Sequence, residues 1–129
     1  MTDVVVDTQA LIWHLVEPRN LAKAARRTLA AADSGKLLCH VPVIVLAEVA
    51  LLNERGRIRV GVQQVLASLA AHSGYAILPL DAEQCLEFAA LIGIRDPTDR
   101  LVAAASLVVR ARLISSDASF DEHLERIWD

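Results

Sequence analysis

Short apolar runs alternate with helical patterns along the whole chain, and this alternation constrains the fold more than any other feature. Each run has the length of a strand, and each is followed by apolar residues that recur at helical spacing. The strands are expected at residues 4–6, 37–41, 76–80 and 113–116, and the helices at residues 8–15, 21–32, 42–54, 60–72, 82–91 and 97–110. Strands that alternate with helices pair in parallel through right-handed crossovers. The sequence therefore predicts a three-layer α/β/α fold with a central parallel sheet of four to five strands, as a single domain over residues 1–129.

The composition limits the classes of function. Of the 129 residues, 54% are hydrophobic, which argues against disorder. Cys39 and Cys85 have no His or Cys at metal-ligand spacing, so we expect reduced thiols and a cytoplasmic protein. No basic segment precedes the first apolar residues, and no apolar run approaches the roughly 18 residues of a membrane span. The net charge of −3 gives no general attraction to nucleic acid, so such a partner would need a local patch or a bound metal.

The densest group of charged residues is the segment from Asp96 to Arg100, at the start of a predicted helix. Pro97 suits the first helical position, so Asp96 is predicted to be the N-cap and Asp99 the third residue of the first turn. Both carboxylates then lie at the positive end of the helix dipole. In isolation this segment is explained by capping alone.

Other acids are predicted to lie near the same place. Asp7 and Asp117 directly follow buried strands, and the carboxyl ends of parallel strands form the edge of the sheet at which ligands bind. Glu48 lies in an otherwise apolar helix that begins at this edge, where a carboxylate needs a partner or a role. With Asp96 and Asp99, four or five carboxylates from distant positions converge on one edge.

Capping explains each acid singly but not the convergence of several. For Asp33, Asp81 and Asp121 we assign capping as the only role. Clustered carboxylates repel one another and raise one another's pKa unless a cation is bound. Hard oxygen ligands without His or Cys favour Mg²⁺ or Mn²⁺. The chemistry that follows is hydrolysis of a phosphodiester bond by a metal-activated water.

Four motifs, in order along nearly the whole chain, resemble PIN domains of the VapC-like toxin type. They are Val5-Val6-Asp7-Thr8, the buried Glu48, the signature Asp96-Pro97-x-Asp99-Arg100-Leu101, and Ser115-Ser116-Asp117-x-x-Phe120. The resemblance implies a Mg²⁺- or Mn²⁺-dependent endoribonuclease that is the toxin of a toxin–antitoxin pair. Its partners would be RNA, a small VapB-like antitoxin and a second copy in a homodimer.

The resemblance also implies roles for individual residues. Asp7, Glu48, Asp99 and Asp117 would be the catalytic acids, and Asp96 would join Asp7, Asp99 and Asp117 as a metal ligand. The chain departs from the family pattern at Ile94, where many relatives have His, and at Ser115, where Thr is usual. The first difference would bear on substrate handling, and the second keeps the hydroxyl group.

Several arginines have two interpretations. Arg100 would contact the scissile phosphate or balance the neighbouring acids. Arg55, Arg57 and Arg59 would follow an RNA backbone or form an ordinary solvated loop.

Two other classes of protein are compatible with parts of the pattern. A receiver domain also places acids at strand ends, but it needs a lysine late in the chain, and the only lysines are Lys23 and Lys36. A catalytically silent interaction domain would keep the fold while losing the acids, all of which are present here.

Overall fold

The computed structural model describes residues 2–129, and in it strands and helices alternate as the sequence predicts. The strands are β1 (Asp3–Val6), β2 (Leu38–Pro42), β3 (Tyr75–Leu78), β4 (Arg112–Ile114) and β5 (Arg126–Ile127). The helices are α1 (Thr8–Val16), α2 (Lys23–Asp33), α3 (Val43–Glu54), α4 (Val62–Ala70), α5 (Ala82–Ala90) and α6 (Pro97–Val109). Two 3₁₀ helices, η1 (Pro18–Asn20) and η2 (Ala118–Glu122), complete the described elements.

All five strands are parallel, in the order β3-β2-β1-β4-β5. The central strand β1 pairs with β2 on one side and β4 on the other, so that Val5 lies between His40 and Leu113. Valines 4–6 are almost fully buried, as expected for a parallel strand covered on both faces. The three-layer fold with four to five parallel strands is confirmed.

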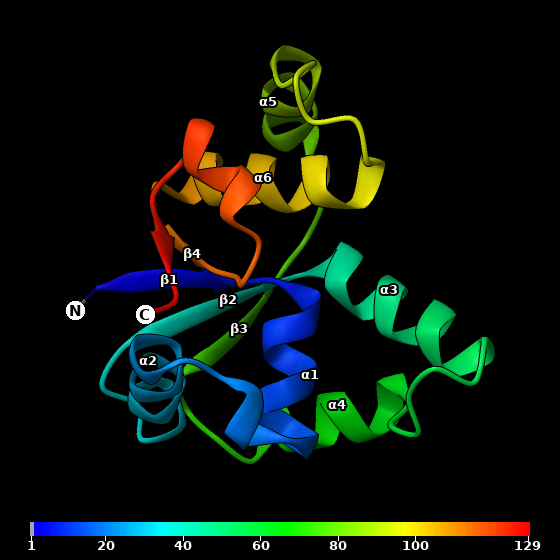
Figure 1. Ribbon diagram of the computed structural model, residues 1–129, viewed down its shortest axis with the longest axis vertical. Coiled ribbons are helices and arrows are strands. Elements are labelled where there is room, and N and C mark those ends of the chain that lie inside the picture. The colour runs from blue at the N-terminus through cyan, green and yellow to red at the C-terminus, as the bar shows by residue number, and fades with distance from the viewer. Residues whose placement is uncertain (1) are drawn as a thin grey trace.

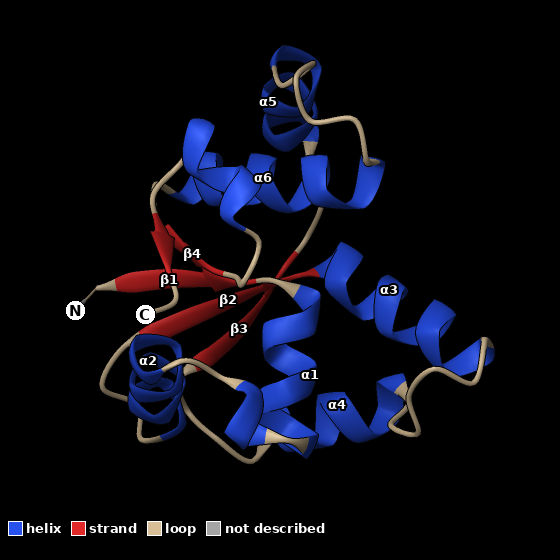
Figure 2. Ribbon diagram, viewed as in Figure 1, coloured by secondary structure: helices blue, strands red, loops and turns tan. Residues whose placement is uncertain are grey.

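Helices cover both faces of the sheet (Figure 2). Figure 1 shows α5 and α6 on one side and α1, α2 and α4 on the other, while α3 lies beyond the end of the strands. Helix α3 contacts α1 and α6, one from each layer. The carboxyl ends of β1 and β4 are therefore bordered by α1, α3 and α6.

The fifth strand is the main element that the sequence pattern does not specify. Residues 126 and 127 pair with Leu113 and Ile114 of β4, in a segment from which only packing of the tail is expected. A strand of two residues has no measurable periodicity. Its position is determined by the neighbouring strand β4.

Candidate functional site

Asp7 lies at the carboxyl end of the central strand and begins α1. Its backbone N–H donates to the Ile114 carbonyl of β4 at 3.0 Å, which fixes the main chain between the two strands. Its Oδ1 accepts from the Thr8 backbone N–H at 2.8 Å, and its Oδ2 accepts from the Ser115 hydroxyl at 2.8 Å. Burial raises the pKa of Asp7 despite the opposing effects of these two hydrogen bonds, and nearby Glu48 and Asp117 raise it further.

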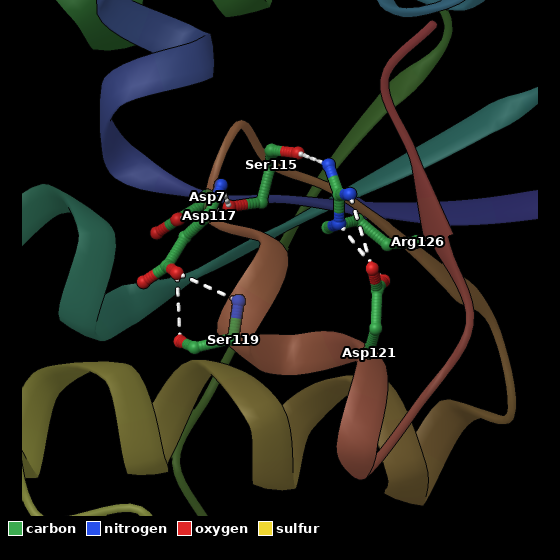
Figure 3. A network of polar contacts seen from close by, with 6 residues as sticks. All are labelled: Asp7, Ser115, Asp117, Ser119, Asp121 and Arg126. Atoms are coloured by element: carbon green, nitrogen blue, oxygen red, sulfur yellow. Dashed lines mark hydrogen bonds and ion pairs between the residues drawn. The ribbon is translucent and has the colours of Figure 1, made fainter.

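Asp117 is held by the segment that follows β4. Its backbone N–H donates to the Ser115 hydroxyl oxygen at 3.1 Å, so this one hydroxyl joins Asp7 to Asp117. One carboxylate oxygen of Asp117 accepts from the backbone N–H and the hydroxyl of Ser119, at 3.0 and 2.7 Å. Figure 3 shows the Asp7 and Asp117 carboxylates pointing toward the same side.

Arg126 supports this arrangement from β5. Its guanidinium donates to both carboxylate oxygens of Asp121, at 3.0 and 3.2 Å, and to the Ser115 carbonyl at 2.9 Å (Figure 3). The Asp121 carboxylate raises the pKa of Arg126. Sequence reasoning missed this residue, because a lone arginine near the end of a chain carries no recognisable pattern. It also assigned Asp121 to capping, which is wrong because its carboxylate pairs with Arg126.

Asp96 and Asp99 occupy the first turn of α6, as predicted. The Asp96 Oδ1 accepts from the backbone N–H groups of Thr98 and Asp99 at 2.8 and 3.1 Å, so the N-cap prediction is confirmed. Asp99 is half-buried. Burial, followed by the charges of Asp96, Asp7, Asp117 and Glu48, raises the pKa of Asp99 to about 6.

Glu48 contributes to the same electrostatic environment from α3. Its side chain is half-buried, and its charge raises the pKa of both Asp7 and Asp99. In residues 2–129, Glu48 has no ion-pair partner. Asp99 is therefore within electrostatic range of the four other acids that the sequence points to, and Asp7 is within range of Glu48 and Asp117.

The donor groups fit a hard divalent cation, although the geometry is open. In the described part of the chain, no three His, Cys, Asp or Glu side chains lie close enough together to form a direct metal site. Mg²⁺ usually keeps several water ligands and binds through one or two carboxylates, so three direct protein ligands are not required. Burial is the main cause of the raised pKa values of Asp7 and Asp99, and the neighbouring carboxylates raise them further, as expected of acids that share a site without a countercharge.

Arg100 does not face the acids. Its Nε donates to the Phe88 carbonyl at 2.8 Å, one Nη contacts the Ala89 carbonyl at 3.5 Å, and the guanidinium lies 4.3 Å from the centre of the Phe88 ring. It thus binds carbonyls near the end of α5, where a cation complements the helix dipole. Neither of the two interpretations of Arg100 from the sequence matches these contacts.

The remaining acids that the sequence analysis assigned to capping divide into two cases. Asp81 caps α5 by accepting from the Gln84 backbone N–H at 3.0 Å, as predicted. Asp33 is not an N-cap, because it closes α2 and accepts hydrogen bonds from Tyr75 and His14.

The lysine required by a receiver domain is not supplied, since Lys23 lies on α2 and Lys36 precedes β2 at the opposite edge of the sheet.

Together, the parallel sheet and its acidic carboxyl edge define an α/β protein with a candidate cation site between α1, α3 and α6. A profile of the PIN domain family matches residues 4–124. The chain therefore belongs to the PIN domain family. Among curated protein sequences, none matches the chain significantly.

Solved structures confirm a VapC-like PIN fold. VapBC2 from Rickettsia felis, bound to a DNA fragment from its promoter, aligns with a TM-score of 0.73 at 17% identity, over 99% of this chain and 100% of that one. FitAcB from Neisseria gonorrhoeae aligns with a TM-score of 0.64 at 15% identity, over 95% of each chain. VapC20 from Mycobacterium tuberculosis, a toxin that cleaves the sarcin-ricin loop, aligns with a TM-score of 0.63 at 17% identity, over 98% of this chain and 99% of that one.

Two further findings concern the helices and the cysteines. Across residues 2–129, every helix is too short or too polar to cross a membrane. Cys39 is buried and Cys85 is exposed, and both are free thiols.

Proposed function

We propose that this chain is a Mg²⁺- or Mn²⁺-dependent endoribonuclease in which Asp7, Glu48, Asp99 and Asp117 are the catalytic acids. The observation that carries the proposal is the electrostatic coupling of Asp99 to four other carboxylates, which helps to raise its pKa to about 6. Such coupling makes the fold less stable unless a cation is bound. Membership of the PIN domain family supports the same site.

Hydrogen bonds orient individual acids of the site, which would hold a cation partly through water. Asp7, Asp96, Asp99 and Asp117 are the proposed ligands. Asp96 has one carboxylate oxygen committed to the α6 amides, so its other oxygen is the one available to a ligand. A divalent cation bound there would supply Lewis-acid chemistry, activating water and neutralising charge on the phosphate. Ser115 orients two of the acids by its hydrogen bonds to Asp7 and Asp117.

We further propose that the nuclease is the toxin of a toxin–antitoxin pair in the cytoplasm. The structural neighbours include a toxin–antitoxin complex from Klebsiella pneumoniae, which supports a small VapB-like antitoxin as the partner. Helices α3 and α4 pack together and leave Val43, Leu51 and Leu66 between 39% and 46% exposed. An amphipathic segment of the antitoxin would cover these side chains. A homodimer is expected, as in the family.

Cleavage of RNA by the purified protein tests the enzymatic proposal. We expect cleavage with Mg²⁺ or Mn²⁺ and none with a chelator. Asp99→Asn should lose at least about 100-fold in rate, since electrostatic groups in an active site are commonly worth that much. Asp81→Asn, which alters an acid at a different helix start, is the matched control and should cleave normally. Equal rates in wild type and Asp99→Asn, with contaminating nuclease excluded, would favour a silent interaction domain.

A further inference from the structure

A cavity of about 260 Å³ opens directly beside the acidic edge. One wall is the loop before α6, residues 93–95, together with Asp96 and Asp99. The other wall comes from η2 and the residue after it, with Ser119, Phe120, Glu122 and His123. The cavity therefore shares two acids with the proposed catalytic site but is formed largely by residues that have no role there.

The two walls are held against each other. Phe120 is 2% exposed and anchors η2 in the core. The imidazole of His123 rests against Gly93, since a Cβ built on that glycine would lie 3.4 Å from the His123 Cε1. The ring is thus placed by packing against the opposite wall.

The side chains that line the cavity suit a flat, neutral ligand. Arg95 and His123 are planar groups, and within residues 2–129 neither side chain has a hydrogen-bonding or ion-pair partner. Asp96 and Asp99 would be offset by the proposed cation, and the charge of Glu122 offsets that of Arg95, so the cavity has no excess positive charge with which to hold a second phosphate. Single-stranded RNA is recognised by stacking of bases on His rings and Arg planes and by hydrogen bonds to base edges.

We infer that this cavity is the subsite for the base of the nucleotide adjoining the scissile phosphate. The inference rests on the proposed function, because the neighbouring acids set where the phosphate lies. His123 and Arg95 contact the faces of the base. Glu122 accepts from an exocyclic amino group, as acidic side chains do when they read cytosine. The subsite therefore prefers adenine, cytosine or guanine over uracil.

Binding of RNA pentanucleotides tests the inference without cleavage, in Ca²⁺ instead of Mg²⁺. Each position of the pentamer is replaced in turn by an abasic nucleotide. We expect one position at which loss of the base weakens binding about fivefold, the low end for base stacking. At that position the abasic change should not weaken binding to the His123→Ala or Arg95→Ala variant. Arg95 is exposed, so its replacement leaves the core intact. Glu125→Gln, three residues from Glu122 and outside this cavity, should behave as wild type.

Cleavage of a randomised RNA provides the second measurement. Wild type should disfavour uracil at one position next to the cut, and Glu122→Gln should lose that preference while still cleaving. Binding that is unaffected by every abasic change, or a base preference that Glu122→Gln leaves intact, would overturn the subsite. If the abasic effect and its loss in His123→Ala are seen but no RNA is cleaved, the cavity is a base-binding site and the nuclease proposal fails.

Discussion

The Ser115 hydroxyl donates to the Asp7 carboxylate at 2.8 Å, across 108 residues of sequence. The same oxygen accepts from the Asp117 backbone N–H at 3.1 Å, and the Ser115 side chain is almost completely buried. Two acids from different strand ends are therefore positioned by one side chain. Because this hydrogen bond opposes the rise in the pKa of Asp7 caused by burial, Ser115 affects both the geometry and the charge of the site.

Ser115→Ala should weaken both effects. We expect a loss of about 1–2 kcal/mol in the free energy of unfolding, since a buried acceptor and an amide lose their partner. The pKa of Asp7 should rise further, so the acidic limb of the pH–rate profile for RNA cleavage should move to higher pH. Ser115→Thr keeps the hydroxyl and is the control. A pH profile unchanged in the alanine variant would show that Ser115 is only structural.

Arg126→Met tests whether β5 positions the site from a distance. The change removes the hydrogen bonds to Asp121 and to the Ser115 carbonyl but keeps most of the aliphatic stem. We expect Mn²⁺ binding, measured by calorimetry, to weaken several-fold, while most of the fold remains. Arg112→Met, at an exposed position of the adjacent strand β4, is the matched control. Equal Mn²⁺ affinity in the two variants would remove Arg126 from the support of the site.

The parts of the site that could be predicted from the sequence are those that depend on local rules. Asp96 could be placed as an N-cap because Pro97 and the following apolar residues define a helix start. Asp7 and Asp117 could be placed at one edge because acids that follow parallel strands share it. These rules need only the order of elements, and the structure follows them.

The other parts depend on side-chain directions that only tertiary packing determines. Arg100 is adjacent to Asp99 in sequence, yet its guanidinium lies on Phe88 of α5. Arg126 contacts Ser115 only because the short β5 pairs with β4. Neither relationship has a characteristic spacing, so no motif could have revealed it.

Asp99→Asn should stabilise the cation-free protein in a pH-dependent way. The pKa of Asp99 rises from 3.8 to about 6 on folding. A shift of this size lowers the free energy of unfolding at neutral pH by about 3 kcal/mol, which solvent screening of this half-exposed group reduces to roughly 1 kcal/mol. Below pH 4 the carboxyl is protonated in both states, so wild type and variant should not differ. Between about pH 4 and pH 6 the free energy of unfolding of wild type falls relative to that of the variant, and above pH 6 the full difference is present.

Thermal unfolding with chelator at several pH values measures this difference. The variant should melt about 4 °C above wild type at pH 7 and level with it at pH 4. Added Mg²⁺ should raise the melting temperature of wild type more than that of the variant. A lower melting temperature for Asp99→Asn at every pH would instead indicate that Asp99 acts only on the helix dipole.

Arg100→Ala should separate a structural role from a catalytic one. Loss of the hydrogen bond to the Phe88 carbonyl and of the contact with its ring should cost about 1–2 kcal/mol and increase hydrogen exchange in α5. RNA cleavage, measured well below the melting temperature, should stay within about threefold of wild type. A loss of about 100-fold in a folded variant would restore the phosphate contact considered from the sequence.

Glu48→Gln separates the proposed chemistry from partner binding on a single helix. The change is nearly isosteric and removes only the charge of a half-buried side chain, so the fold and the apolar surface of α3 should persist. We expect cleavage to fall by about 100-fold, while an antitoxin encoded next to the toxin gene should still co-purify. Leu51→Glu, on the same helix at a side chain that is 46% exposed, should give the opposite result, because it places a charge where an apolar segment would dock. If both variants lose the antitoxin, α3 does not separate the two functions. If Glu48→Gln cleaves RNA at the wild-type rate, α3 again does not separate them, and Glu48 is not a catalytic residue.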